Sequence, residues 1–508
     1  MRKGHGSIII VGAGINGLVA ANYLQRSGFR VTLLERKAQV GGACTVETTR
    51  HRGTTITYPP GASVLGMMQR FVFKETGLAN EVDIRSPRCP EIVYFAGEEP
   101  FVFPDNDGDL AAQVKTRWGE NGRVSAFLED LERVAAYLRA GYRRGEAPTL
   151  RDAEQKLGRD LVALWITGSA RNLVDHYLTS DRMKIFFAIS ITESGPVSLD
   201  APYSAFTLPV MTSGSVFDGK WGFVKGGIWN LTRALHRINT RLGVRTITEA
   251  RVTAVSAAAH KVRFRKNAQT RELSADRVVF ATDPLSAAKL IHDRALIDKV
   301  LSQQLQGSSG KLVMIFERPV RWKGDNGRRD FHAAFRYVVL NNTLEAFERS
   351  SQAPKHGVDF SPGFLEIYCE GPAMEMMGLR NKFHIISVFF KDLGFGKAGK
   401  DLPQVREQVS NWVCEHIENA GDLIKTILET PKDIARTFYF PMGNIDHTEL
   451  TGGQTFFERT YSPNPDRSFY QFGGHENVFY CGAGSYPCGS VAGTPGYMCA
   501  RQILRLAT

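Results

Sequence analysis

The feature that most limits how this chain can fold is a strand-turn-helix-strand pattern within its first 35 residues. Residues 7–11 are a short apolar run of the kind found in buried parallel strands. Three glycines follow at once, residues 18–26 place apolar side chains on one helical face, and Gly28 ends that helix. Residues 31–35 form a second apolar run that ends in Glu35. This order predicts the first unit of a dinucleotide-binding α/β domain.

Each glycine of the turn has its own task in such a unit. Gly12 allows a tight turn, Gly14 lets the backbone approach a pyrophosphate, and Gly17 lets the helix pack on the strand. The helix N-terminus offers N–H groups and partial positive charge to the phosphates, and the acid can accept both ribose hydroxyls. An ordinary glycine-rich turn would leave that acid unexplained. The predicted binding residues here are Gly12, Ala13, Gly14, Asn16, Gly17, Glu35 and Arg36.

A second glycine pair, six residues after the acid, indicates which dinucleotide is bound. The stretch 12–43 resembles the flavoprotein superfamily of amine oxidases and carotenoid desaturases, in which the ligand is FAD. The resemblance implies that the pair lies along the pyrophosphate and ribityl chain, that a loop at residues 58–63 passes under the flavin, and that one backbone group faces the adenine. A plain surface loop is the alternative for residues 58–63. The implied contacts are Gly41, Gly42, Ala43, Pro60, Gly61, Ala62, Ser63 and Val252.

A second family resemblance lies near the C-terminus. Residues 477–481 are predicted to form a buried strand, followed by a small-residue run to residue 496 and a helix over 497–506. The run closely resembles the C-terminal signature of phytoene desaturases and their relatives, including carotenoid ketolases, retinol saturases and pyridine-nucleotide-disulfide-oxidoreductase-like proteins. It implies flavin contacts from Gly482, Gly484 and Val491, and a helix N-terminus directed at the N1–O2 edge, where negative charge builds on reduction.

Three departures from that signature supply the candidates for chemistry. The family's usual His, Gly and Gly are here Tyr486, Cys488 and Ser490, and the larger residues narrow the floor under the flavin, which argues against a long carotenoid substrate. Tyr486 is a candidate hydrogen-bond donor to substrate or a simple stacking residue. Cys488 is a candidate flavin tether, a redox thiol or a small packed residue. His447, in a Gly-Asn-x-x-His element that resembles part of the family, is a candidate base, a substrate contact or a structural histidine.

The predicted fold class is α/β, with a Rossmann-type FAD-binding domain assembled from discontinuous segments, a mixed-sheet substrate domain and a helical subdomain. The FAD-binding domain is predicted to comprise residues 1–85, 216–298 and 471–508. The substrate domain comprises residues 86–107 and 299–470, where runs of Phe, Ile and Val predict a separate sheet with an aromatic-lined pocket. The helical subdomain comprises residues 108–215, where apolar side chains recur at helical spacing.

Charge and cysteine content narrow the remaining possibilities. The 63 Lys+Arg against 52 Asp+Glu give a net charge of +11, the only support for nucleic-acid binding, so no nucleic-acid partner is predicted. Arginines between residues 133 and 144 raise the alternative of peripheral membrane contact, but neighbouring acids favour a solvated helix face. Seven scattered cysteines without metal-ligand spacing favour a reducing, cytoplasmic compartment and predict no metal site.

The predicted function is that of an FAD-dependent oxidoreductase that removes hydride from a carbon centre of an apolar small molecule, as a desaturase or dehydrogenase does. Glycines at 394, 396 and 399 repeat the nucleotide spacing without an acidic strand end, so no NAD(P)H domain is predicted and the flavin is reoxidised by oxygen or a quinone. An amine or amino-acid oxidase and a redox-neutral flavin isomerase are the alternatives. The oligomeric state is left open.

Overall fold

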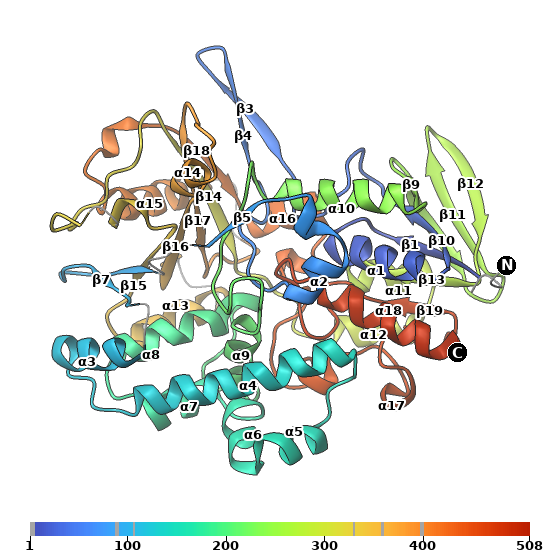
Figure 1. The fold of residues 1–508 in the computed structure, drawn as a ribbon, viewed down its shortest axis with the longest axis horizontal. Coiled ribbons are helices and arrows are strands. Elements are labelled where there is room, and N and C mark those ends of the chain that lie inside the picture. The colour runs from blue at the N-terminus through green and yellow to red at the C-terminus, as the bar shows by residue number, and fades with distance from the viewer. Residues whose placement is uncertain are drawn as a thin grey trace.

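The N-terminal pattern forms a parallel sheet to which three distant stretches of chain contribute (Figure 1). The computed structural model describes residues 6–86, 91–104, 107–328, 331–356, 360–396 and 401–507. Every neighbouring pair in this sheet is parallel. Its strands are, in order, β19 (Val478–Tyr480), β13 (Arg277–Phe280), β1 (Ser7–Val11), β2 (Arg30–Leu34) and β9 (Arg245–Ile247).

The two faces of this sheet are covered by different elements, because successive strand residues point in opposite directions. Ile8 and Ile10 pack in one core with the helices on that side, whereas Ile9 and Val11 pack in another. The first side carries α1 (Ile15–Arg26), α10 (Trp229–Arg241) and α18 (Thr494–Ala507). The second carries the antiparallel strands β10 (Arg251–Ser256), β11 (Lys261–Lys266) and β12 (Gln269–Ser274) with α11 (Pro284–Leu290) and α12 (Arg294–Leu301).

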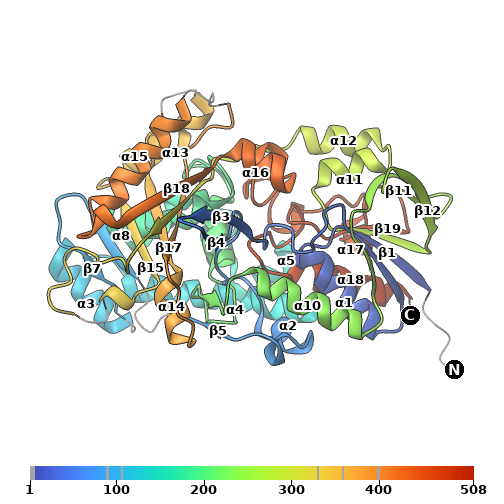
Figure 2. The ribbon, with the colours of Figure 1, turned by 90° about the horizontal axis from the view of Figure 1, so that it is seen from above.

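A separate mixed sheet forms the other half of the molecule (Figure 2). Its β15–β6 pair is parallel and its other pairs are antiparallel. The strands predicted at 311–317, 364–369 and 383–390 match β14, β16 and β17 to within one residue. In order, the sheet holds β18 (Leu423–Glu429), β14 (Gly310–Phe316), β17 (His384–Phe390), β16 (Phe364–Cys369), β15 (Arg336–Leu340), β6 (Ile92–Phe95) and β7 (Phe101–Val102).

Shorter elements lie around and between the two sheets. Helix α16 lies between the halves in the view of Figure 2. The hairpin of β3 and β4 projects from the molecule in Figure 1. These elements are β3 (Glu47–His51), β4 (Thr54–Tyr58), α2 (Arg70–Glu75), β5 (Ile84–Arg85), β8 (Phe223–Val224), α13 (Leu344–His356), α14 (Glu370–Met376), α15 (Leu402–Cys414), α16 (Pro431–Phe438) and α17 (Pro465–Ser468).

A helical layer lies below the mixed sheet in Figure 1. The apolar stripe predicted for its longest helix, α4 (Val124–Arg144), is buried except for the half-buried Leu128. Its basic residues Arg133, Arg139, Arg143 and Arg144 each pair with a carboxylate, which supports the solvated-face interpretation. The layer comprises α3 (Asp107–Trp118), α4 (Val124–Arg144), α5 (Leu150–Leu157), α6 (Arg159–Trp165), α7 (Ala170–Tyr177), α8 (Asp181–Ala188), the 3₁₀ turn η2 (Ile189–Ser194) and α9 (Thr207–Met211).

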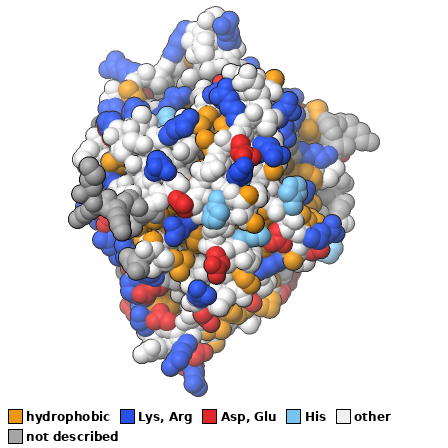
Figure 3. All heavy atoms as spheres, turned by 90° about the vertical axis from the view of Figure 1, so that its right-hand side faces the viewer, with side chains coloured by type: hydrophobic (Ala, Val, Ile, Leu, Met, Phe, Trp, Pro, Cys, Tyr) orange, Lys and Arg blue, Asp and Glu red, His pale blue; other side chains and the backbone are white. Residues whose placement is uncertain are grey.

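The predicted fold class is therefore confirmed, with a Rossmann-type sheet built from separate segments, a mixed sheet and a helical part. Within the described ranges, no helix is long and apolar enough to span a membrane. On the face shown in Figure 3, Lys and Arg side chains are scattered among acidic and apolar ones rather than gathered in one continuous patch. Cys89 and Gly399 lie outside the described residues.

Candidate active site

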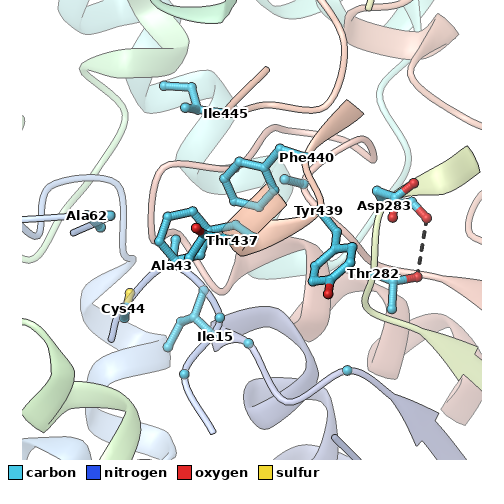
Figure 4. A pocket seen from close by; sticks show the side chains of 18 of the residues that line it. Ile15, Ala43, Cys44, Ala62, Thr282, Asp283, Thr437, Tyr439, Phe440 and Ile445 are labelled. Carbon is cyan, nitrogen blue, oxygen red and sulfur yellow. Dashed lines mark hydrogen bonds between the residues drawn. The ribbon is translucent and has the colours of Figure 1, made fainter. Parts of the chain in front are cut away.

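One cavity of about 600 Å³ begins at the glycine turn after β1 and reaches the mixed sheet. Figure 4 shows Ile15 and Ala43 with Phe440 above them and Tyr439 to their right. The cavity thus lies where the carboxyl ends of the parallel strands face the second half of the molecule, which is the usual ligand position in an open α/β sheet.

The glycine turn has the close backbone packing that the motif predicts. Gly12 has a φ of 103°, and a Cβ on it would lie 2.9 Å from the Ala281 carbonyl oxygen. A Cβ on Gly17 would lie 2.1 Å from the carbonyl oxygen of Gly12, so only glycine fits. The N–H of Gly41 donates to the Ala13 carbonyl at 2.9 Å, which brings the second glycine pair alongside the first. The two glycine motifs therefore form one wall.

Glu35 stands at the end of β2 and lines this cavity. Its Oε2 accepts a hydrogen bond from the Ala13 N–H and its Oε1 accepts one from the Lys37 N–H, both at 2.9 Å. Because each carboxylate oxygen has two lone-pair sites, one site on each remains for a ligand hydroxyl. Arg36 packs over the ring of Tyr439, and burial lowers the pKa of its guanidinium. The acid is thus held in place and still able to accept.

Lys311, at the start of β14, joins the mixed sheet to the predicted flavin loop. Its Nζ donates to the carbonyl oxygens of Pro59 and Gly61 and to the hydroxyl oxygen of Ser63. Burial lowers the pKa of this ammonium group, and the nearby carboxylates of Glu370 and Glu429 oppose that shift. All three hydrogens of the ammonium group are therefore used to hold one loop.

The inner end of the cavity combines aromatic walls with two carboxylates. Tyr368 and Phe389 come from β16 and β17, and Glu366 lies beside them on β16. Glu193 enters from the helical part through η2, and Lys391 pairs with it at 3.4 Å. Burial raises the pKa of Glu193, and Lys391 opposes that shift. This end can hold an apolar skeleton and also exchange a proton or bind a cation.

Another wall of the cavity is formed by residues from the C-terminal part of the chain, namely His447 and the turn at residues 489–491. The His447 Nδ1 lies 3.4 Å from the Tyr480 hydroxyl oxygen. Burial, assisted by Arg459, lowers the pKa of His447 to about 3, so the ring is neutral at pH 7. Val491 lines the cavity as well. This neutral histidine can accept or donate one hydrogen bond at the cavity wall.

Two of the three candidates for chemistry lie elsewhere. Tyr486 and Cys488 are buried and are not among the described residues that line the cavity. The Tyr486 ring packs near those of Tyr142, Phe456 and Phe469, and burial raises the pKa of the Cys488 thiol. Both side chains therefore pack against other side chains and do not line the cavity.

Most residues predicted to bind the nucleotide do line the cavity. Ala13, Gly17, Gly482 and Gly484 do not line it; a Cβ on Gly482 would lie 2.1 Å from the Thr282 carbonyl oxygen, so this glycine allows two strand ends to meet. The predicted residues that line the cavity are Gly12, Gly14, Asn16, Glu35, Arg36, Gly41, Gly42, Ala43, Pro60, Gly61, Ala62, Ser63, Val252, His447 and Val491.

Several lining residues were not foreseen from the sequence. They come from the mixed sheet, from η2 and from the end of α16, and no local motif marks them. The aromatic content of the strands at 364–369 and 383–390 predicted a pocket, but it did not identify the residues that line it. These residues are Glu193, Lys311, Glu366, Tyr368, Phe389, Thr437, Phe438, Tyr439 and Phe440.

The cavity has the donor set that a dinucleotide requires. Gly14 and Gly42 approach so closely that a Cβ on Gly42 would lie 3.2 Å from the Gly14 Cα, which leaves a smooth backbone cradle. The N-terminus of α1 supplies N–H groups beside it. The Asn16 Oδ1 is buried and has no hydrogen-bond partner among the described residues, although its side chain lines the cavity. The residues present therefore fit FAD.

A nucleotide-binding sheet whose cavity continues into a second, substrate-sized sheet defines a dinucleotide-dependent oxidoreductase. The chain belongs to the flavin containing amine oxidoreductase family, whose profile matches residues 15–376. It is an FAD-dependent oxidoreductase that acts on a small molecule, and the predicted superfamily is confirmed.

The chain is similar to known proteins over between about half and nearly all of its length. It is similar to the mouse (Mus musculus) pyridine nucleotide-disulfide oxidoreductase domain-containing protein 2, at 23% identity over 98% of this chain and 93% of the relative. It is similar to phytoene desaturase of Neurospora crassa, at 26% identity over 47% of this chain and 40% of that enzyme. Among solved structures, cyclohexylamine oxidase from Brevibacterium oxydans IH-35A shares the fold, with a TM-score of 0.61 and 13% identity over 99% of this chain and 98% of that one.

Proposed function

We propose that this chain removes a hydride from a carbon centre of a small organic molecule whose skeleton is largely apolar, and that oxygen or a quinone then takes up the electrons. The observation that carries the proposal is one continuous cavity, which joins the nucleotide wall at Glu35 to the aromatic inner end at Tyr368 and Phe389. Bound FAD supplies the hydride acceptor. A substrate at the inner end would share one enclosed space with that acceptor.

The residues of the chain position the reactants and control protons. The rings of Trp221, Tyr368 and Phe389 exclude water and bind an apolar skeleton. Lys311 fixes the loop at residues 59–63, which lies between the nucleotide wall and the inner end. Glu193, with its raised pKa, lies at the substrate end of the cavity, where it can accept a proton from a substrate that carries a basic group.

Oxidation of an amine is a second candidate, favoured by the carboxylate of Glu193 at the inner end, since Glu366 there is already paired with Arg336. A carboxylate there attracts an alkylammonium group and can accept its proton. The carbon next to nitrogen would lose a hydride and the nitrogen a proton, which gives an imine. Water then hydrolyses the imine to a carbonyl compound and an amine or ammonia, and oxygen that takes up the two electrons leaves as hydrogen peroxide.

The test uses purified protein loaded with FAD and mixed anaerobically with panels of apolar alkenes and alkylamines. Bleaching of the flavin by one panel identifies the substrate class, and subsequent addition of oxygen or a quinone identifies the acceptor. Peroxide release with amines alone would move the assignment to amine oxidation. A protein that binds FAD but is bleached by neither panel would contradict hydride removal from both classes.

Glu193→Gln separates the two candidates. We expect the variant to keep its FAD and its bleaching by apolar substrates, but to raise the KM for amines about tenfold, because a charge-assisted hydrogen bond is lost. Glu348→Gln is the matched control, since Glu348 binds Ser198 and Leu199 and is not among the described residues lining the cavity. An unchanged KM for amines in Glu193→Gln would remove this support for amine oxidation.

A further inference from the structure

The turn at residues 489–491 has an unusual backbone where it forms the cavity wall. Ser490 and Val491 have φ values of 53° and 60°, both in the left-handed region. That region is unfavourable for a β-branched side chain such as valine, so the surrounding structure must impose it. Among the described residues, neither the Ser490 N–H nor the Val491 N–H has a hydrogen-bond partner. Two backbone donors are thus held at the wall.

A buried carboxylate holds this turn from behind. Asp446 Oδ1 accepts a hydrogen bond from the Gly489 N–H at 2.9 Å, and the Asp446 side chain is fully buried. The fit is tight: a Cβ on Gly489 would lie 2.8 Å from that same oxygen and 3.0 Å from the Ala483 Cβ. The turn therefore rests directly on Asp446, and glycine at 489 makes the contact possible.

Asp446 is in turn fixed by two buried polar side chains. Its N–H donates to Asn444 Oδ1 at 2.9 Å, and Arg459 Nη2 donates to the Asp446 carbonyl at 2.7 Å and the Ala483 carbonyl at 3.0 Å. Arg459 Nη1 donates to Thr448 Oγ1 and the Gln454 carbonyl. A buried aspartate and arginine are costly to desolvate, so packing alone does not explain them. Together they tie the segment at 444–448 to the segment at 483–489.

We propose that Asp446 is a positioning residue, which fixes the turn at 489–491 so that its two unpartnered N–H groups face the flavin. This proposal depends on one part of the proposed function, namely that the cavity binds FAD. Donors that face a position where negative charge builds favour the reduced form of the ligand over the oxidised form. Asp446, which lies behind the cavity wall, therefore affects both the affinity of the protein for FAD and the reduction potential of the bound FAD.

The test compares five FAD-loaded variants, which are Asp446→Ala, Asp446→Asn, Gly489→Ala, the double variant Asp446→Ala/Gly489→Ala, and Glu449→Gln. Asp446→Ala removes the acceptor, and Gly489→Ala pushes the turn off it while leaving the Asp446 side chain in place. Asp446→Asn keeps an oxygen that can accept the Gly489 N–H. Glu449→Gln is the matched control, because Glu449 is equally buried, lies three residues away and pairs with Lys355. The dissociation constant of FAD and the potential, measured by reductive titration against a reference dye, need no substrate.

We expect Asp446→Ala and Gly489→Ala each to weaken FAD binding about tenfold and to weaken binding of the reduced flavin about tenfold more, which lowers the potential by about 30 mV for a two-electron couple. The double variant should be no worse than the more affected single one, because both changes break one contact. Asp446→Asn and Glu449→Gln should keep the affinity within about twofold of wild type.

If Asp446→Ala does not fold, Gly489→Ala decides the matter. Equal affinities and potentials in Gly489→Ala and Glu449→Gln would overturn the proposal. A holoenzyme that shows these shifts but is bleached by no substrate would contradict the proposed reaction and leave the role of Asp446 standing.

Discussion

At the scale of single residues, the site depends on side chains that connect segments far apart in the chain. The Lys311 ammonium group reaches a loop about 250 residues earlier and donates to three of its oxygens. A buried ammonium group costs free energy unless all its hydrogens are bonded. Here they are, so the lysine fixes the distance between the loop and the mixed sheet.

Replacing Lys311 by methionine tests this connection. We expect Lys311→Met to fold but to bind FAD at least about tenfold more weakly, because the carbonyls of Pro59 and Gly61 lose a charged donor. The measurement is a fluorescence titration of the apoprotein with FAD. Lys299→Met is the control, since Lys299 is exposed and donates to a single carbonyl, that of Thr460. Equal affinities in the two variants would contradict the connecting role.

The carboxylate at the end of β2 gives a second prediction. Glu35→Gln should weaken FAD binding by about ten- to a hundredfold, because a hydrogen bond to a charged acceptor contributes about 1.5–3 kcal/mol. Glu47→Gln, on the exposed face of the β3–β4 hairpin, should leave the affinity unchanged. Isothermal titration of each apoprotein with FAD measures both values, and a wild-type affinity in Glu35→Gln would show that ribose recognition lies elsewhere.

The same residues show which parts of the site a sequence can reveal. Gly12, Gly14 and Glu35 follow one another at fixed spacing around a single strand-helix-strand unit, so local order was enough to predict them. Lys311 begins an otherwise apolar strand, and Glu193 lies in a short turn after a helix. Only the tertiary packing of the two halves brings them to the cavity, and no local pattern records that packing. Tyr486 and Cys488 were singled out for departing from a motif, and both are packed away from the cavity.

At the scale of elements, helix α16 delivers the aromatic residues that close one side of the cavity. Thr430 caps it: the Thr430 Oγ1 accepts from the Asp433 N–H, and Asp433 Oδ2 accepts from the Thr430 N–H. Phe438, the last residue of the helix, packs so closely on the loop that a Cβ on Gly61 would lie 2.9 Å from its ring. The cap therefore helps to set where the aromatic side chains lie.

Removing this cap gives a stability prediction. Thr430→Ala should lower the free energy of unfolding by about 1 kcal/mol, because the Asp433 N–H loses its acceptor and the bond from the Thr430 hydroxyl to Asp433 Oδ2 is lost. Asp401→Ala is the matched control, since Asp401 is the N-cap of α15 but makes no side-chain capping bond there. Urea unfolding of the FAD-loaded proteins measures both. If the two variants lose the same stability, the capping box of α16 is not what stabilises the helix.

Element boundaries were predicted well where strands are buried and less well at helix starts. β14, β16 and β17 agree with their predicted ranges to within one residue, because uninterrupted apolar runs mark fully buried strands. Helix α1 begins at Ile15, three residues before its predicted start, because the glycine turn itself contains the first helical residues. Glycine usually indicates that a helix is interrupted, whereas here it lies within the helix and allows close packing.

At the scale of the whole molecule, buried histidines make stability depend on pH. Burial, assisted by Arg459, lowers the pKa of His447 to about 3, against about 6.5 in an unfolded chain. Between these values the unfolded chain binds the proton and the folded chain does not, so stability is full above pH 6.5 and falls as the pH drops toward 3. From pH 7 to pH 5 this one residue should cost about 2 kcal/mol.

His447→Gln should remove that part of the pH dependence. We expect the difference in unfolding free energy between pH 7 and pH 5 to shrink by about 2 kcal/mol in this variant. His356→Gln, at the exposed end of α13, should leave the difference as it is in wild type. Urea unfolding of the apoproteins at both values of pH gives the result, and an unchanged difference in His447→Gln would show that this histidine does not titrate between them.

The order in which the chain is made has a consequence for the parallel sheet. β1 and β2 are synthesised long before β19 and α18, which belong to the same sheet and core, and a Cβ on Gly496 would lie 2.1 Å from the Asn16 carbonyl oxygen. On the ribosome, the nascent chain exposes the glycine turn long before the wall at Val491 has left the exit tunnel. The finished flavin pocket therefore forms only after nearly all of these 508 residues have been translated, so cofactor loading is a late event in biosynthesis.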